Sequence, residues 1–245
     1  MQYYKYDASG NDFVIFYTNE TKDYSTLAIE LCAKDQFDTD GLVALLPHES
    51  LDFQWQFYNN DGSVASMCGN ATRAVAIFAS THGIAKDSMR FLTGAGEISC
   101  QVNGDIVETQ MTEPTIIKEP FEEDGYDCWI VDTGVPHVVI MTNDINNFDK
   151  EVCAKFRHKY NANVNFASVD DGKLLVRTFE RGVEGETLAC GTGMVASFLR
   201  ANNLGLIKNE VKVYPTSKEE LTIKLDNGTL YFSGRVKFIE QREIN

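Results

Sequence analysis

Two cysteine–glycine pairs are the residues of this sequence best suited to chemistry. Cys68-Gly69 and Cys190-Gly191 lie 122 residues apart (from position 68 to position 190), close to half of the 245-residue chain. Each pair comes directly before a run of small and apolar residues that predicts a helix. Because unpaired backbone N–H groups converge at a helix start, we expect the pKa of each thiol to be lowered.

Two such thiols suit one reaction best, the inversion of the α-carbon of an amino acid. One cysteine would remove the α-hydrogen as a thiolate, and the other would return a proton to the opposite face. The N–H groups at both helix starts would stabilise the negative charge that spreads into the substrate carboxylate. We therefore predict that Cys68 and Cys190 are the catalytic pair. The remaining cysteines are expected to be small apolar residues of the core: Cys32, Cys100, Cys128 and Cys153.

The turns ahead of the two cysteines differ between the halves of the chain. In the first half, Asn59 belongs to a turn of neutral amides. In the second half, Glu180 offers a carboxylate that would hold an ammonium group, and Arg181 offers a guanidinium that would grip a second carboxylate. Taken alone, each is an ordinary exposed turn, so only the position before a cysteine favours a role in the site.

Three further polar residues leave two interpretations open. His137 follows a Gly-Val-Pro turn, and it is either close to the site or purely structural. Asn163 and Asn165 alternate on a predicted strand and face opposite ways, which allows at most one of them to reach a ligand.

The sequence places a helix after each cysteine and strands around it. The first helix is predicted from Ala71 until His82-Gly83 ends it, and the second from Met194 to Asn203. Both are apolar on all sides, which predicts burial inside a surrounding sheet. Strands are predicted at residues 13–16, 53–58, 97–102, 106–111, 129–132, 138–141, 165–169, 173–179, 211–214, 221–225 and 230–238. Hairpin turns are predicted at Asn103-Gly104, Asp171-Gly172 and Asn227-Gly228.

The repeated motifs predict a duplicated domain. Gly10 and Gly134 stand in similar segments 124 residues apart, nearly the offset of the two cysteines. A period this long indicates two domains and not a solenoid array. We predict domains at residues 1–117 and 118–245, joined by a linker in the acidic, proline-containing stretch from Glu113 to Gly125.

Composition excludes several classes of protein. The formal net charge is −14, so a nucleic-acid backbone or an anionic membrane surface would be repelled. The amino terminus lacks a basic and then apolar signal pattern, and no apolar run approaches the about 20 residues of a membrane helix, which predicts a cytoplasmic protein. The scattered cysteines and histidines predict reduced thiols and no metal. No phosphate-binding glycine loop with a partnered lysine is present, so no pyridoxal or other cofactor is predicted.

Seven short motifs, taken together, resemble the diaminopimelate epimerase family over essentially the whole chain. They are Ser9-Gly10-Asn11-Asp12-Phe13, Tyr58-Asn59-Asn60-Asp61-Gly62-Ser63, Met67-Cys68-Gly69-Asn70, Gly134-Val135-Pro136-His137, Asn163-Val164-Asn165-Phe166, Glu180-Arg181-Gly182 and Cys190-Gly191-Thr192-Gly193. The resemblance implies a cofactor-independent isomerase that interconverts LL- and meso-diaminopimelate on the route to lysine and peptidoglycan. It also implies a cytoplasmic homodimer whose partner molecule is a small amino-acid substrate.

The resemblance assigns a fold and a site. The fold class is α+β, with two pseudo-symmetric halves, each a curled, mostly antiparallel sheet around a central helix, and with the last strand able to pack on the first half. Catalysis falls to Cys68 and Cys190, supported by His137 and Glu180. The backbone at the helix starts binds substrate through Gly69, Asn70, Gly191 and Thr192. Further substrate contacts are expected from Asn11, Asn59, Asn163, Glu180 and Arg181.

Two alternatives to this assignment stay open, and a departure from the family pattern favours the first of them. Val135 stands where the family commonly has asparagine, so one polar contact to the substrate is missing. The first alternative is a cofactor-independent racemase of another amino acid. The second, from a different class, is a non-catalytic amino-acid-binding module that kept the duplicated helix starts.

Overall fold

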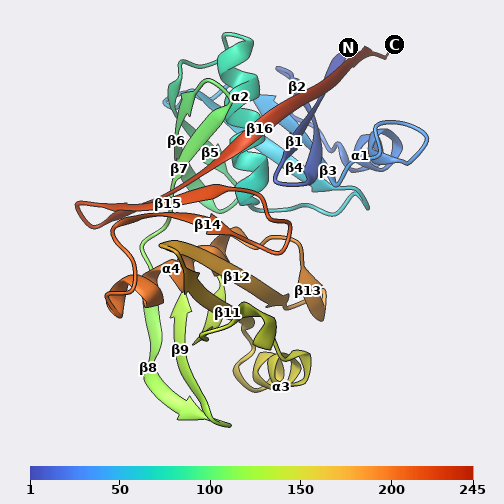
Figure 1. The fold of residues 1–245 in the computed structure, drawn as a ribbon. Helices are drawn as coiled ribbons and strands as arrows, with labels where there is room; N and C mark the ends of the chain where they lie inside the picture. The colour runs from blue at the N-terminus through green and yellow to red at the C-terminus, as the bar shows by residue number, and fades with distance from the viewer. Residues whose placement is uncertain (245) are drawn as a thin grey trace. The chain divides into compact units, whose positions relative to one another are not determined.

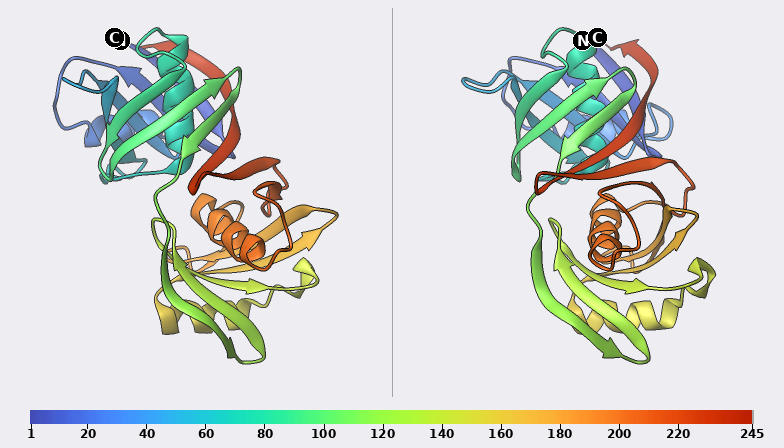
Figure 2. Two further views of the ribbon diagram at one scale, coloured as in Figure 1. Left: turned by 90° about the vertical axis from the view of Figure 1, so that its left-hand side faces the viewer. Right: turned by 60° about the vertical axis from the view of Figure 1, so that its left-hand side comes forward.

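The chain folds as two compact units, each built around one buried helix (Figures 1 and 2). The computed structural model describes residues 1–244. Unit 1 comprises residues 1–110 and the carboxy-terminal residues from Ser233 onwards, and unit 2 comprises Met111–Phe232. The chain therefore returns to unit 1 at its end, so that both termini belong to the same unit.

Unit 1 is a strand-rich shell around helix α2. Its strands follow the order β1-β2-β3-β4-β5-β6-β7, and β16 lies next to both β7 and β1, which closes the sheet. Helix α1 packs on β3 and β4 from outside. The elements are β1 (Gln2–Ala8), β2 (Asn11–Tyr17), α1 (Ser25–Cys32), β3 (Gly41–Leu46), β4 (Phe53–Asn59), α2 (Gly69–Thr81), β5 (Ser88–Thr93), β6 (Gly96–Asn103), β7 (Ile106–Gln110) and β16 (Thr229–Glu243).

Unit 2 repeats this plan around helix α4. Its strand order is β15-β14-β12-β11-β10-β9-β8, with β13 beside β12 and the first residues of β16 beside β15. The elements are β8 (Thr115–Glu123), β9 (Tyr126–Asp132), β10 (Pro136–Met141), the 3₁₀ helix η1 (Ile145–Asn147), α3 (Lys150–Tyr160), β11 (Asn163–Asp170), β12 (Lys173–Glu180), β13 (Gly185–Thr187), α4 (Gly191–Asn203), β14 (Glu210–Tyr214) and β15 (Leu221–Asp226).

The two units share one pattern of strand pairing. In unit 1, the pairs β1–β2, β3–β4 and β5–β6 are antiparallel, and β2–β3 and β4–β5 are parallel. In unit 2, β9–β10, β11–β12 and β14–β15 are antiparallel, and β10–β11 and β12–β14 are parallel. In each unit the buried helix follows the fourth strand of this series. The predicted fold class, two pseudo-symmetric halves with mostly antiparallel curled sheets around a central helix, is confirmed.

Hydrophobic patterning explains why these helices lie inside. Strand β4 alternates, with Phe53, Trp55 and Phe57 buried and the intervening glutamines partly exposed. Helices α2 and α4 bury residues on all sides, and their small residues, alanine in α2 and glycine, alanine and serine in α4, let strands approach closely. The predicted burial of both helices is confirmed. None of the helices among residues 1–244 is long and apolar enough to cross a bilayer.

Two local predictions are wrong. The stretch from Glu113 to Gly125, predicted as a linker, contains β8, an exposed edge strand that pairs with β9. At the β6–β7 hairpin, Asn103 pairs with Ile106, so the turn consists of Gly104 and Asp105 and not of Asn103-Gly104. The hairpins at Asp171-Gly172 and Asn227-Gly228 form as predicted, with positive φ at all four residues.

Candidate active site

Cys68 in unit 1 is the N-cap of α2. Its backbone is extended (φ −147°, ψ 124°), and its carbonyl accepts the first helical hydrogen bond from the N–H of Thr72 at 2.9 Å. The thiol receives hydrogen bonds from the backbone N–H groups of Asn70 and Ala71. These N–H groups, together with the positive charge of Arg73, lower the pKa of the thiol, but burial raises it more, and the net direction is upward.

Asn70 is held in one orientation beside Cys68. Its Nδ2 donates to Oδ1 of Asn11 at 2.5 Å, and its Oδ1 accepts from a guanidinium nitrogen of Arg73 at 2.8 Å. Asn11 in turn donates from Nδ2 to Oδ2 of Asp40 at 3.0 Å. A second donor, the backbone N–H of Asp12, lies 3.1 Å from the same oxygen. A directed chain of hydrogen bonds therefore runs from the helix start to a carboxylate.

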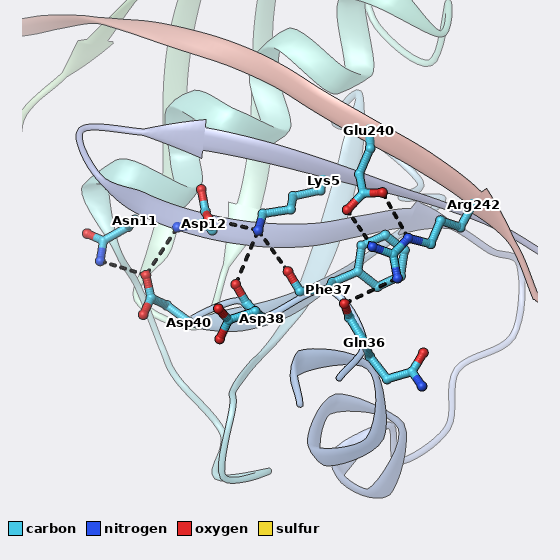
Figure 3. A network of polar contacts seen from close by, with 9 residues as sticks. All are labelled: Lys5, Asn11, Asp12, Gln36, Phe37, Asp38, Asp40, Glu240 and Arg242. Atoms are coloured by element: carbon cyan, nitrogen blue, oxygen red, sulfur yellow. Dashed lines mark hydrogen bonds and ion pairs between the residues drawn. The ribbon is translucent and has the colours of Figure 1, made fainter. Parts of the chain in front are cut away.

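The loop that carries Asp40 is anchored to strands β1 and β16, as Figure 3 shows. The ammonium group of Lys5 pairs with Asp12 at 3.0 Å and donates to the carbonyl of Phe37 at 2.7 Å. The guanidinium of Arg242 packs over the ring of Phe37 and donates to the carbonyl of Gln36 at 3.2 Å. These contacts hold the loop at the residues ahead of Asp40, and strand β3 begins directly after it.

Asn59 lies at the end of β4, opposite Gly41. Its Nδ2 donates to the hydroxyl of Ser63 at 2.9 Å, and the next residue, Asn60, donates its N–H to the carbonyl of Asp40 at 3.0 Å. Unit 1 thus links the predicted site residues Asn11 and Asn70 through hydrogen bonds, and connects the turn of Asn59 to them through Asp40.

Cys190 in unit 2 is the N-cap of α4, as Cys68 is of α2. Its backbone is extended (φ −133°, ψ 105°), and its carbonyl accepts from the N–H of Met194 at 3.0 Å. Burial, and then the negative charge of Glu180, raise the pKa of the thiol to about 11. The hydroxyl of Thr192 and the N–H groups of Gly193 and Thr192 act against these effects.

The prediction that each helix start lowers the thiol pKa is wrong in its net direction. The helix N–H groups lower the pKa at both cysteines, as expected. Burial outweighs them, because a thiolate loses its hydration inside the protein. Sequence shows the helix start but not the degree of burial.

His137 is completely buried on β10 and joins Cys190 through Thr192. Its Nε2 lies 2.9 Å from Oγ1 of Thr192, and its Nδ1 lies 3.0 Å from Nδ2 of Asn165. Burial, together with the smaller effect of the positive charge of Arg181, lowers the pKa of the imidazole to about 3, so the ring is neutral. Asn165, which the sequence left open, therefore contacts this histidine directly.

Glu180 and Arg181 begin the turn ahead of Cys190, and Asn163, at the start of β11, lies beside them. Oδ1 of Asn163 accepts from the backbone N–H of Arg181 at 2.8 Å. The guanidinium of Arg181 is exposed and donates to the carbonyl of Asn161 at 3.0 Å. Burial raises the pKa of Glu180, and the side chain of Thr187 acts in the opposite direction. A carboxyl and a guanidinium are therefore available in the unit that holds Cys190.

Three residues of these networks were not among the predicted site residues. Asp40 and Asn165 each form a hydrogen bond with a predicted residue, and Thr178 forms one with Asn165. The only signal for them is position, since Asp40 precedes β3 and the other two lie on neighbouring strands β11 and β12. Within residues 1–244, all six cysteines are free, and no three histidine, cysteine, aspartate or glutamate side chains gather as a metal site would require.

Solved structures with the same fold cover nearly the whole chain. A putative phenazine biosynthesis PhzC/PhzF protein from Clostridium difficile aligns with a TM-score of 0.76 at 15% identity, over 100% of this chain and 99% of that one. A probable proline racemase from Agrobacterium radiobacter aligns with a TM-score of 0.72 at 13% identity, over 100% of this chain and 92% of that one. At such low identity the likeness concerns the fold alone.

Sequence relatives are much closer. A diaminopimelate epimerase of Nitratiruptor is 53% identical over 239 residues, covering 97% of this chain and 96% of the relative. One from Campylobacter jejuni strain RM1221 is 48% identical over 247 residues, covering 100% and 99%. One from Helicobacter pylori is 38% identical over 258 residues, covering 98% and 94%. The diaminopimelate epimerase family model also matches residues 3–117 and 129–239. With relatives this similar along the whole chain, the protein belongs to the diaminopimelate epimerase family of isomerases.

Proposed function

We propose that the protein interconverts LL- and meso-2,6-diaminopimelate without a cofactor, with Cys68 and Cys190 as the acid/base pair. One observation carries the proposal: in each unit a cysteine is the N-cap of the central buried helix, and its sulfur faces the N–H groups of the next residues. A thiol in this setting can hold or release a proton beside a ready-made anion site.

The proposed reaction takes one proton from the α-carbon, returns another proton to its opposite face, and leaves the net charge unchanged. In one direction, the thiolate of one cysteine takes the α-hydrogen, so a C–H bond breaks and an S–H bond forms. The electron pair left on the α-carbon spreads into the carboxylate. The thiol of the other cysteine then gives its proton to the opposite face of the carbon and becomes the thiolate. In the reverse direction the two cysteines exchange roles.

The helix starts supply the stabilisation that this carbanion needs. The backbone at Gly69 and Asn70 in unit 1 and at Gly191 and Thr192 in unit 2 would donate to the substrate carboxylate as its charge grows. N–H groups at the same helix starts lower the pKa of each thiol against the effect of burial, so they also favour the thiolate that takes the α-hydrogen. His137 and Glu180 would support Cys190 by setting the charge and hydrogen bonds around it.

The remaining predicted residues would hold the part of the substrate that does not react. Glu180 and Arg181 match the distal ammonium and carboxylate groups of diaminopimelate. The side-chain amides are proposed to complete the contacts: Asn11, Asn59 and Asn163. We further propose that the protein acts in the cytoplasm as a homodimer on the route to lysine and peptidoglycan, as the family resemblance implies.

Solvent deuterium exchange tests the proposal. The wild-type protein in heavy water is expected to incorporate one deuterium at the α-carbon of LL- and meso-diaminopimelate and to interconvert them. Cys68→Ser and Cys190→Ser are each expected to abolish interconversion. Unchanged turnover in either variant would remove the two-thiol mechanism.

A panel of other amino acids separates the alternatives. Exchange on a different amino acid, but none on diaminopimelate, would replace the substrate and keep the chemistry, as Val135 allows. Tight binding of an amino acid without any solvent exchange would instead favour the non-catalytic binding module.

A further inference from the structure

Four polar side chains of unit 2 form a continuous line that ends at the sulfur of Cys190. Nδ2 of Asn165 lies 3.0 Å from Nδ1 of His137. Nε2 of the same ring lies 2.9 Å from Oγ1 of Thr192, and that oxygen lies 3.6 Å from Sγ of Cys190. Asn165 and His137 are completely buried, so water does not compete for these hydrogen bonds.

The direction of this line is fixed at Asn165. The carbonyl of Val138 lies 3.1 Å from the side-chain nitrogen of Asn165, and a backbone carbonyl can only accept. The hydroxyl of Thr178 donates to the side-chain oxygen at 2.9 Å. The amide nitrogen therefore faces His137, because a reversed carboxamide would place its oxygen against the carbonyl of Val138, where neither group can donate.

The direction at Asn165 decides which nitrogen of His137 carries hydrogen. Because an N–H group points at Nδ1, this nitrogen must be an acceptor. A neutral imidazole has one donor and one acceptor, so the hydrogen is on Nε2 and is donated to Oγ1 of Thr192. A proton added at Nδ1 would point at the N–H group of Asn165, which disfavours the imidazolium.

The consequence reaches Cys190 through the single hydrogen of the Thr192 hydroxyl. Since Oγ1 receives a hydrogen bond from His137, its own hydrogen remains available for the sulfur, where it stabilises the thiolate. With the opposite tautomer, Thr192 would have to donate to His137 and would present only lone pairs to the sulfur. The charged groups that act on this line are Glu180, on Cys190, and Arg181, on His137.

We propose that Asn165 is a positioning residue, which fixes His137 as the neutral Nε2–H tautomer and so reserves the Thr192 hydroxyl hydrogen for the Cys190 sulfur. The inference rests on the proposed function only in giving Cys190 a role in proton transfer. The hydrogen-bond direction itself is a property of the folded protein and can be measured without substrate.

Nitrogen-15 NMR of the imidazole rings tests the tautomer directly. In the wild type we expect Nδ1 of His137 to be unprotonated and Nε2 protonated, with no change from pH about 5 to about 9. The His137→Gln variant identifies the signals. In Asn165→Asp the carboxylate can only accept a hydrogen bond, so Nδ1 of His137 is expected to become protonated and to donate to it. A protonated Nδ1 in the wild type, or unchanged signals in Asn165→Asp, would overturn the proposal.

Alkylation of the thiols tests the consequence at Cys190. The rate at each cysteine is followed against pH by mass spectrometry, and Cys68 on the same molecule is the internal control. Thr192→Val is expected to slow alkylation of Cys190 at neutral pH by about tenfold, which corresponds to about one pKa unit. Thr192→Ser keeps the hydroxyl and is expected to restore the wild-type rate. If the alkylation rate of Cys190 depends on pH in the same way in Thr192→Val as in the wild type, the proposal is contradicted.

A matched pair of buried variants separates direction from packing. Asn165→Leu removes the donor to His137, whereas Thr178→Val removes a hydrogen bond from the same carboxamide but leaves its nitrogen facing the ring. Only Asn165→Leu is expected to change the tautomer signals and to slow the alkylation of Cys190. Equal effects of the two variants on the tautomer signals and on Cys190 alkylation would show that Asn165 has only a structural role. If both variants fail to fold, the wild-type NMR and the Thr192 pair still decide the outcome.

The two proposals fail separately. If the protein shows the expected tautomer and the expected changes in Cys190 alkylation, but no deuterium exchange with diaminopimelate, the proposed role of Asn165 stands and the proposed function is wrong. If the protein exchanges deuterium normally but His137 carries its hydrogen on Nδ1, the proposed function stands and the proposed role of Asn165 is wrong.

Discussion

A Cβ atom at position 193 would lie 2.3 Å from Oδ1 of Asn165, so the first turn of α4 packs directly against the carboxamide that holds His137. The same atom would lie 3.1 Å from the hydroxyl of Thr178. Glycine is required at this position because there is no space for a side chain. The start of the helix and the line of polar side chains beneath it therefore depend on each other.

Gly193→Ala is expected to lower the free energy of unfolding by about 1–3 kcal/mol, because the added methyl group must displace Asn165 or the helix. Denaturant unfolding measures the loss. Gly191→Ala is the matched control in the same turn, since its Cβ would meet only the ring of Phe232, at 3.8 Å. Equal losses in the two variants would show that space at Gly193 is not the cause.

Asp40→Ala tests the chain of hydrogen bonds that orients Asn70. The variant removes the acceptor of Asn11 and of the Asp12 N–H. We expect kcat/KM of the proposed epimerisation to fall about tenfold to a hundredfold through misplacement of the helix-start residues. Stability is expected to change by less than about 1 kcal/mol, because Asp40 is exposed.

Asp35→Ala is the control for this prediction, because it removes the same charge from an exposed position of the same loop. It is expected to keep nearly the wild-type kcat/KM. A similar decrease in both variants would assign the effect to net charge and not to the orientation of Asn70.

Glu180→Gln is expected to make the Cys190 thiol more reactive. The carboxylate of Glu180 helps to raise the pKa of this thiol to about 11, because negative charge disfavours the thiolate. Its removal is expected to lower the pKa and to speed alkylation at neutral pH by up to about tenfold. Site-resolved alkylation measures the rate, with Cys68 as internal reference and Glu184→Gln as the control on the same turn. Slower alkylation of Cys190 in Glu180→Gln would contradict the prediction that the carboxylate raises the pKa of this thiol.

His137 is expected to make stability depend on pH in the acid range. Burial lowers the pKa of the folded imidazole to about 3, whereas an unfolded imidazole titrates near 6.5. Folding favours the neutral ring, so this contribution is complete above pH about 6.5 and is lost as the pH falls towards 3. At about 1.4 kcal/mol for each pH unit, it reaches several kcal/mol.

Unfolding free energies at a series of pH values measure this contribution. Below pH about 6.5, His137→Gln is expected to have a shallower slope than the wild type, although it is less stable at neutral pH. His158→Gln changes an exposed histidine and is expected to keep the wild-type slope. Identical slopes in all three proteins would mean that His137 accepts a proton in the folded state.

The local elements were largely predictable from the sequence, and the reason is visible in β4 and α2. Alternation of apolar residues in β4 and the uninterrupted apolar character of α2 depend on neighbours within a few positions. Strand β8 escaped prediction because its residues are almost all exposed and show no alternation. The turn after β6 moved by one residue because register, set by the pairing of Asn103 with Ile106, decides which residues form a turn.

The sequence by itself determined the two cysteines, their glycines and the helices that they begin, because an N-cap and a helix are local properties of the chain. Only the tertiary structure decided what surrounds them. Asn165 reaches His137 across 28 residues, and His137 reaches Thr192 across 55, because parallel pairing of β10 with β11 and the buried position of α4 place them together. Burial also decided the direction of the thiol pKa, since it depends on every segment that excludes water from the sulfur.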